Sequence, residues 1–124
     1  MSKTTRGDVN HEWAHSGYVE AGDFVFLSYC VGNVEKSVEE QVHGALDHME
    51  TRLAEVDLTL SDVVKLDILL RDVWNIPIMG KVFKERFGGA YPARKTISTD
   101  FAHAGGPGGL HVQLDGIAYR RKHE

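Results

Sequence analysis

The sequence has 124 residues, 42% of them hydrophobic and 26% charged, with a formal net charge of −4. This length suits one domain over residues 1–124 with a substantial core, and no apolar run is long enough to cross a bilayer. The acidic balance makes nucleic-acid binding an unfavoured function, since phosphate contacts need a clustered basic surface. Cys30 is the single cysteine, which excludes an intrachain disulfide. The single cysteine and the lack of an apolar signal segment at the N-terminus together predict a reducing, cytoplasmic location.

The N-terminal region is polar, and we expect residues 1–12 to be irregular. His11-Glu12-Trp13-Ala14-His15 matches the H-E-x-x-H motif of zinc proteases, which needs a helix to bring both imidazoles onto one face. Here Ser16-Gly17 follows at once and no helical periodicity flanks the motif. We therefore interpret the match as a coincidence and expect no metal site.

Hydrophobic periodicity predicts strands and helices along the rest of the chain. In chain order they are strands over 18–21 and 23–30, a helix over 37–56, a strand over 62–72, a helix over 75–87, and strands over 91–101 and 110–119. Ser37 and Glu40 form a capping box at the start of the first helix. Gly80 falls on the apolar stripe of the second helix, where we expect it to pack closely on the sheet. The order β-β-α-β-α-β-β predicts an α+β fold, a mixed sheet with two helices on one face.

The strand over 91–101 begins with an unusual alternation. Arg94 and Thr96 share one face, and Lys95 and Ile97 share the other. Burying a guanidinium is costly unless an anion meets it, and its planar fork matches a carboxylate. Arg94 is therefore either a carboxylate-binding residue or an edge-strand side chain that extends its charge to water. The sequence leaves both alternatives open.

Two helices on one face leave the other face of the sheet uncovered. We expect that face to carry Arg94, Thr96, Gln113 and Asp115, a mixed surface that favours self-association with a site where subunits meet. The glycine-rich segment 104–109 lacks the Gly-Lys-Ser/Thr of a phosphate loop. We interpret it as a turn, although its N–H groups could also meet a carboxylate.

Several features, in this order, resemble the reactive intermediate deaminase (Rid, also YjgF or L-PSP) family over nearly the whole chain. They are the hairpin ending in Ser28, the segment Ser61-Asp62-Val63-Val64-Lys65, the triplet Pro92-Ala93-Arg94, and the closing Val112-Gln113-Leu114-Asp115-Gly116-Ile117-Ala118. The resemblance implies a homotrimer of chorismate-mutase-like subunits with clefts between them. It also implies deamination of 2-imino acids made by pyridoxal-phosphate enzymes, with no cofactor in the deaminase itself.

The resemblance also implies site residues. The essential Arg of the family matches Arg94, and the Glu linked to the hydrolytic water corresponds to Gln113. The chain departs from the family pattern elsewhere: Gly80 replaces an Asn, Thr96 replaces a Cys, and 28–30 replace Ser-Gly-Gln. The residues expected to bind substrate besides Arg94 are Tyr18, Ser28, Tyr29, Cys30 and Thr96.

The favoured function is deamination of 2-imino acids, with Arg94 holding the substrate carboxylate while water attacks the imine carbon. Gln113 is neutral and cannot accept a proton, so Asp115, about 7 Å further along the same face, is the substitute base to consider. The alternative is a non-catalytic trimer that binds small carboxylate or carbonyl metabolites, or a protein partner. RNA cleavage, an activity within the family, is disfavoured by the acidic balance and by the absence of an obvious His pair.

Overall fold

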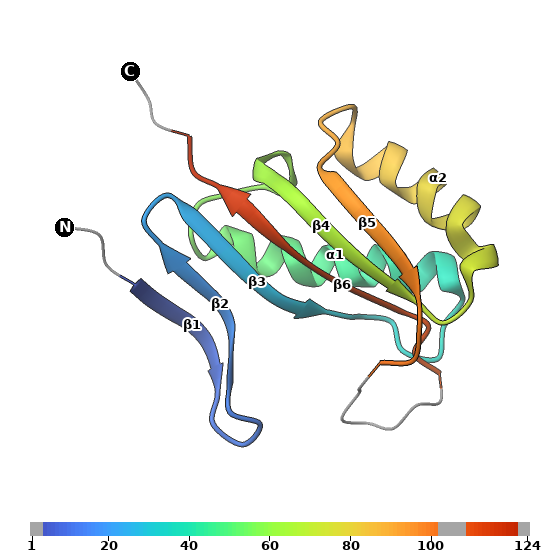
Figure 1. Cartoon of the computed structure of the whole chain (residues 1–124), viewed down its shortest axis with the longest axis horizontal. Coiled ribbons are helices and arrows are strands. Elements are labelled where there is room, and N and C mark those ends of the chain that lie inside the picture. The colour runs from blue at the N-terminus through green and yellow to red at the C-terminus, as the bar shows by residue number, and fades with distance from the viewer. Residues whose placement is uncertain (1–3, 102–108, 122–124) are drawn as a thin grey trace.

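The computed structural model describes residues 4–101 and 109–121. Six strands form one sheet in the order β1-β2-β3-β6-β4-β5, and β4 with β5 is its parallel pair. The strands are β1 (Thr4–Asn10), β2 (His15–Ala21), β3 (Phe24–Cys30), β4 (Val63–Leu70), β5 (Ala93–Ser98) and β6 (Val112–Tyr119). The helices are α1 (Val38–Ala54) and α2 (Ile76–Phe87), with short 3-10 turns η1 (Leu60–Asp62) and η2 (Val73–Asn75). Both long helices lie on one side of the sheet (Figure 1). The predicted α+β class is confirmed.

We had predicted that residues 1–12 are irregular. This is wrong for Thr4–Asn10, which forms the edge strand β1. It pairs antiparallel with β2, with Gly7 opposite Tyr18. Most side chains of this strand are exposed, so its sequence needs no alternation of apolar and polar residues and gives no strand signal. Backbone hydrogen bonds to β2 define the strand. Residues 11–14 form the turn into β2, so the H-E-x-x-H match lies on no helix.

The described part of the chain holds neither a cluster of metal ligands nor a membrane-spanning helix. Residues 4–101 and 109–121 contain no group of three or more His, Cys, Asp or Glu side chains arranged to hold a metal ion. No helix there combines the length and apolar character needed to cross a bilayer.

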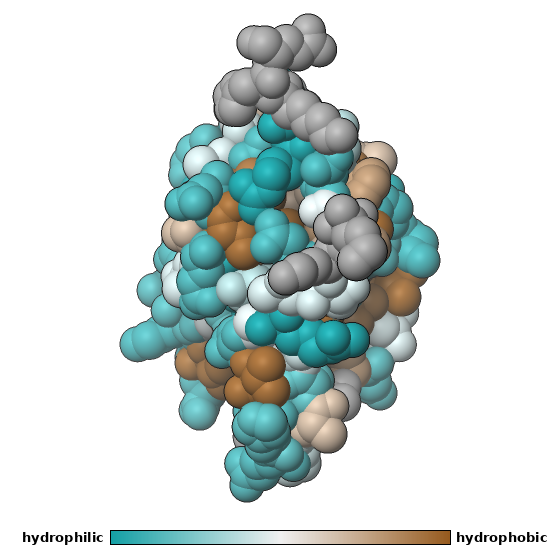
Figure 2. Space-filling model, turned by 90° about the vertical axis from the view of Figure 1, so that its left-hand side faces the viewer, coloured by the Kyte–Doolittle hydropathy of each residue, from teal (hydrophilic) through white to brown (hydrophobic). Residues whose placement is uncertain are grey.

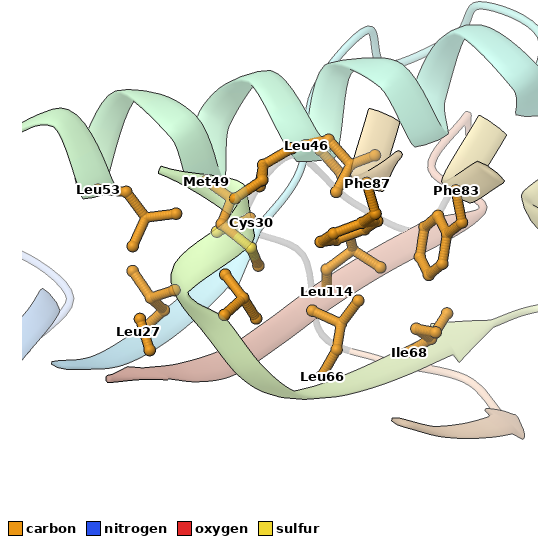
Figure 3. Close-up of a cluster of buried hydrophobic side chains, with 14 of the residues drawn as sticks. Leu27, Cys30, Leu46, Met49, Leu53, Leu66, Ile68, Phe83, Phe87 and Leu114 are labelled. Carbon is orange, nitrogen blue, oxygen red and sulfur yellow. The ribbon is translucent and has the colours of Figure 1, made fainter. Parts of the chain in front are cut away.

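The core lies between the sheet and the two helices (Figure 3). Helix α1 contributes one buried stripe and α2 another, and β3, β4 and β6 supply the facing side chains. The fully buried members of this core include Val25, Cys30, Val42, Ala45, Leu46, Met49, Leu53, Leu66, Ile68, Leu70, Met79 and Leu114. The predicted capping box is present, with Ser37 Oγ accepting from the Glu40 N–H at 3.2 Å and Glu40 Oε1 accepting from the Ser37 N–H at 3.3 Å.

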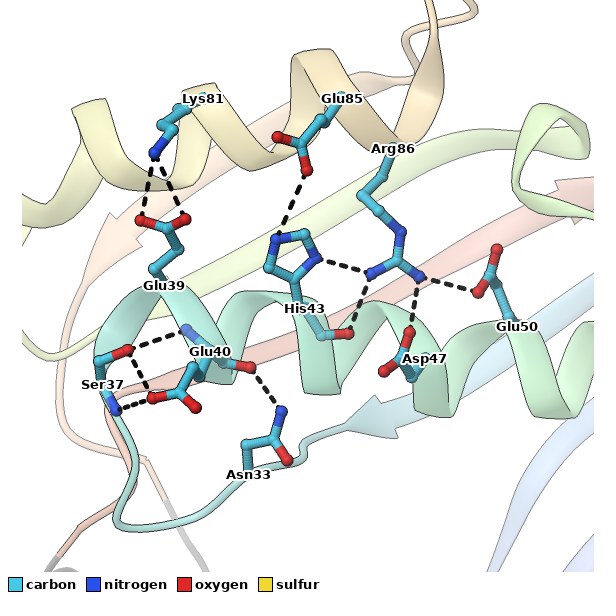
Figure 4. A network of polar contacts seen from close by, with 10 residues as sticks. All are labelled: Asn33, Ser37, Glu39, Glu40, His43, Asp47, Glu50, Lys81, Glu85 and Arg86. Atoms are coloured by element: carbon cyan, nitrogen blue, oxygen red, sulfur yellow. Dashed lines mark hydrogen bonds and ion pairs between the residues drawn. The ribbon is translucent and has the colours of Figure 1, made fainter.

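A polar network fastens α2 to α1 (Figure 4). Arg86 donates from Nη2 to Asp47 at 2.7 Å and to Glu50 at 2.8 Å. Its Nη1 lies 2.9 Å from Nδ1 of His43, whose Nε2 faces Glu85 at 3.7 Å. The network holds α2 against α1, and Gly80, Phe83 and Lys84 of α2 line the cavity described below.

The pairing of β5 with β4 corrects our prediction for the uncovered face. Arg94 pairs with Leu66 and Thr96 with Ile68, and paired residues project to the same side of a sheet. Leu66 and Ile68 are core residues, so Arg94 and Thr96 project to the helix side. The alternation shows which residues share a face but not which face the helices cover.

The uncovered face carries Gln113 and Asp115, as predicted, together with apolar side chains. Phe24, Phe26 and Ile97 keep 43%, 45% and 42% of their surface exposed, and the Phe24 ring lies 5.2 Å from that of Tyr119. The neighbouring edge of the molecule, seen from the side of the N-terminal strands, also carries apolar patches among polar residues (Figure 2). Exposed aromatic clusters of this kind favour association with another protein surface.

Candidate functional site

A cavity of about 280 Å³ lies between α2 and β5. Its lining residues come from the helix, from the turn before the strand and from the strand itself: Gly80, Phe83, Lys84, Tyr91, Pro92 and Arg94. A shallower depression along α2 shares Gly80, Lys84 and Arg94 with it. The cavity is therefore a surface pocket at the sheet edge formed by β5.

We had predicted that Gly80 packs closely on the sheet. This is wrong, because Gly80 lines the open cavity instead. A Cβ built at Gly80 would have no atom within 4 Å. Met79, Val82, Phe83 and Phe87 form the buried stripe of α2, and Gly80 is not among its buried residues. A larger residue at this position would extend into open space, so the glycine leaves room for a ligand.

Arg94 is exposed on the wall of the cavity. Its Cζ lies 5.9 Å from the centre of the Phe83 ring, and its Nη1 lies 3.9 Å from Sδ of Met79. Within residues 4–101 and 109–121, no carboxylate oxygen lies within ion-pair distance of its guanidinium. The guanidinium rests on an apolar surface, at the outer range of a cation–π contact, with its charge available to an anion.

Thr96 lies two residues beyond Arg94 on the same strand. The remaining expected substrate-binding residues lie on β2 and β3, separated from β5 by β6 and β4. Tyr18 is buried and donates its hydroxyl to Glu55 at 3.0 Å; burial and this hydrogen bond raise the pKa of Tyr18. Cys30 lies in the core (Figure 3), where burial raises the pKa of its thiol to about 11 despite the nearby Arg52. Neither side chain reaches Arg94 within one subunit.

Ser28 and Tyr29 form a β-bulge where the register between β3 and β6 shifts. Arg52 holds it from α1, donating from Nη1 to the carbonyl oxygens of Tyr29 at 2.5 Å and Ser28 at 3.3 Å. Its Nε donates to Asp8 at 3.1 Å. A bulge re-aims the side chains around it, and such features recur beside functional sites.

We did not predict Arg52 as a functional residue. Its spacing carried a signal, because Arg52 follows the core residue Met49 by three positions and so falls on the buried stripe of α1. A charged side chain on such a stripe needs polar partners. Gly17 makes room for them, since a Cβ there would lie 2.6 Å from Asp8 and 2.8 Å from Arg52.

Gln113 and Asp115 lie on the opposite face of the sheet from Arg94. Gln113 is buried. Asp115 is half-buried opposite Asp67, and burial, followed by the charge of Asp67, raises its pKa although Lys65 and Lys95 act in the other direction. One subunit thus brings Arg94 together with Gly80, Phe83 and Lys84, but not with Gln113 or Asp115.

Comparison with known proteins agrees with this architecture. The family model described as endoribonuclease L-PSP matches residues 7–106. A 2-iminobutanoate/2-iminopropanoate deaminase of Dermatophagoides farinae is 30% identical over 90 residues, covering 67% of this chain and 70% of the relative. A RutC family protein of Pyrococcus abyssi is 26% identical over 113 residues, or 86% of each chain.

Solved structures extend the likeness to the whole fold. A hypothetical protein from Streptococcus pyogenes M1 GAS, described as a member of the yjgF family, superposes with a TM-score of 0.91 at 59% identity, covering 98% of this chain and 100% of that one. The family model and the structural superposition therefore point to the same family. The chain belongs to the endoribonuclease L-PSP family, whose structurally characterised members include the YjgF proteins.

Proposed function

We propose that this protein hydrolyses 2-imino acids to 2-oxo acids and ammonia, at clefts between the subunits of a homotrimer. The observation that carries the proposal is the guanidinium of Arg94, which lines an open cavity beside an aromatic wall without a carboxylate partner among the described residues. A 2-imino acid presents the complementary group, a carboxylate next to the reactive carbon. A relative that is 30% identical bears the name of such a deaminase.

The reaction is a hydrolysis without redox change. The water oxygen adds to the imine carbon while one water proton passes to the imine nitrogen, which gives a carbinolamine. The hydroxyl proton then moves to nitrogen as the C–N bond breaks, so that ammonia leaves and a carbonyl forms. Arg94 would fix the carboxylate and so orient the imine carbon toward the water.

The described residues that line the cavity include no carboxylate or imidazole that could assist this proton transfer as a base. Gln113 and Asp115 lie on the uncovered face, and a neutral amide cannot accept a proton near neutral pH. A second subunit that brings its uncovered face or its β2–β3 strands to the cavity would supply the missing groups. The exposed aromatic side chains of that face support such an association.

A binding module remains a second candidate, and Gln113 favours it. The amide stands where the resemblance expects the carboxylate that assists the hydrolytic water. A trimer with that replacement could retain Arg94 and bind small carboxylates without turnover. RNA cleavage, which the family description names, finds less support in a chain with a net charge of −4.

The deciding experiment measures ammonia release from freshly generated 2-iminopropanoate and 2-iminobutanoate. We expect wild type to exceed the uncatalysed rate, Arg94→Ala to lose the excess, and Arg94→Lys to recover little, since an ammonium lacks the planar fork. Lys81→Gln, which removes a charge from α2 at a residue 3.4 Å from Glu39, serves as the control for a general loss of positive charge. Wild-type activity no higher than the uncatalysed rate would refute the deaminase, and sedimentation as a monomer would refute the intersubunit site.

A further inference from the structure

Two cations line the cavity between α2 and β5. Besides Arg94, the α2 residue Lys84 contributes to its wall. In the part of the chain that the structure describes, neither side chain has a carboxylate within ion-pair distance. Lys81, one turn earlier on α2, is by contrast 3.4 Å from both carboxylate oxygens of Glu39.

The carboxylate nearest in sequence does not neutralise this pair. Glu85 lines the adjoining depression, but its carboxylate faces Nε2 of His43 at 3.7 Å. Two unneutralised cations that line one cavity, Lys84 from α2 and Arg94 from β5, favour an anionic ligand over a neutral one. A ligand with two anionic groups satisfies both cations at once.

The shape of the cavity also suits a ligand longer than the smallest 2-oxo acids. Its volume of about 280 Å³ is well above the roughly 10–15 Å³ that a cavity needs to hold one water molecule. The absent side chain at Gly80 provides part of this room. Phe83 and Tyr91 give an apolar wall against which a short carbon chain can lie.

We propose that the cavity takes 2-imino and 2-oxo dicarboxylates, with Arg94 on the carboxylate next to the reactive carbon and Lys84 on the distal carboxylate. Lys84 is then the residue that determines substrate class. The reaction of such an imine rests on the proposed deaminase function, whereas the binding of a dicarboxylate does not. A lysine in the last turn of α2 also suits the helix dipole, but that role predicts no preference among ligands.

The test is calorimetric titration of the full chain with 2-oxoglutarate and with 2-oxobutanoate, for wild type, Lys84→Gln and Lys81→Gln. We expect wild type to bind 2-oxoglutarate about tenfold more tightly, the effect of one partly solvated charge-assisted contact. Lys84→Gln should remove the preference while changing 2-oxobutanoate binding by less than about twofold. Lys81→Gln makes the same charge change on the same helix and should keep the preference.

Equal affinity of wild type for the two acids would overturn the proposal. An equal loss of the preference in Lys84→Gln and Lys81→Gln would overturn it as well, because it would indicate a general effect of positive charge on this helix. Absence of any 2-oxo acid binding would overturn it too. A parallel assay compares imines generated from aspartate and from alanine. If neither imine is deaminated but the Lys84-dependent preference persists, the deaminase fails and the dicarboxylate site stands. If both imines are deaminated but the titrations show no Lys84-dependent preference, the dicarboxylate site fails and the deaminase stands.

Discussion

Arg52 offers the sharpest test of how the fold supports the bulge at Ser28 and Tyr29. Its side chain is 5% exposed and donates two hydrogen bonds to those carbonyl oxygens and one to Asp8. Arg52→Met keeps an unbranched side chain of similar length and removes every donor. Both carbonyl groups then lose a charged partner in a site with little access to water.

The magnitude follows from the contact lengths. The bond to Tyr29 at 2.5 Å belongs to the strong, charge-assisted class, worth about 2–3 kcal/mol, and the 3.3 Å contact to Ser28 to the weak end, about 1 kcal/mol. Burial of the methionine side chain returns about 1 kcal/mol. Arg52→Met should therefore lower the free energy of unfolding by about 2–3 kcal/mol.

Asp8→Asn separates the carbonyl contacts from the ion pair. Asp8 has φ of 49°, a backbone conformation that asparagine tolerates, so the substitution removes charge without adding strain. The Asp8 side chain is 50% exposed, and solvent screens its attraction to Arg52. We expect a cost below about 1 kcal/mol, because Arg52 keeps both carbonyl oxygens.

The assay is urea unfolding at neutral pH and fixed protomer concentration, since association contributes to apparent stability. Arg120→Met is the matched control: Arg120 also binds one carboxylate, on Glu20 at 2.6 Å, and one carbonyl, of Val56 at 2.7 Å, but its side chain is 34% exposed. Two results would refute the reasoning: a cost of Arg52→Met no greater than that of Arg120→Met, or a cost of Asp8→Asn equal to that of Arg52→Met.

Three further predictions concern titrating groups and the candidate acid–base residues. Because the pKa of Asp115 is raised in the folded state, its ionisation opposes folding. Asp115→Asn should therefore raise the melting temperature at pH 7, with the gain shrinking as the pH falls toward 3.8; a loss at pH 7 would mean that a neighbouring cation pairs Asp115. Cys30, buried with a pKa of about 11, should resist iodoacetamide at pH 8 until urea unfolds the chain, and rapid native alkylation would contradict its placement. Gln113→Glu should raise ammonia release if a missing base limits turnover, by a factor on the order of ten or more; no gain in a variant that still binds 2-oxo acids would favour the binding module.

The two helices could be predicted because their signals are local. In α1, the Ser37–Glu40 capping box and the apolar spacing lie within one segment, so both can be recognised without knowing the tertiary contacts. Strand β1 carried no comparable signal. It is an edge strand with mostly exposed side chains, and it exists because β2 offers an unpaired backbone edge.

The candidate site was less predictable for a geometric reason. Alternation along β5 correctly grouped Arg94 with Thr96, but only the register with β4 shows that this group projects toward the helices. The cavity itself depends on how α2 packs beside β5, which leaves Gly80 open. Nothing local to Gly80 distinguishes a glycine that permits close packing from one that leaves space.

The division of the predicted site residues between two faces bears directly on mechanism. A sheet separates its faces by the full thickness of the backbone, and the six-stranded sheet is held rigid by helices on one side. Arg94 on one face cannot meet Asp115 or Gln113 on the other through any rotamer change. If both groups act on one substrate, the chemistry requires a second copy of the chain. The proposed ligand contacts, Arg94 and Lys84, belong to one subunit, whereas the proposed hydrolysis needs groups from two.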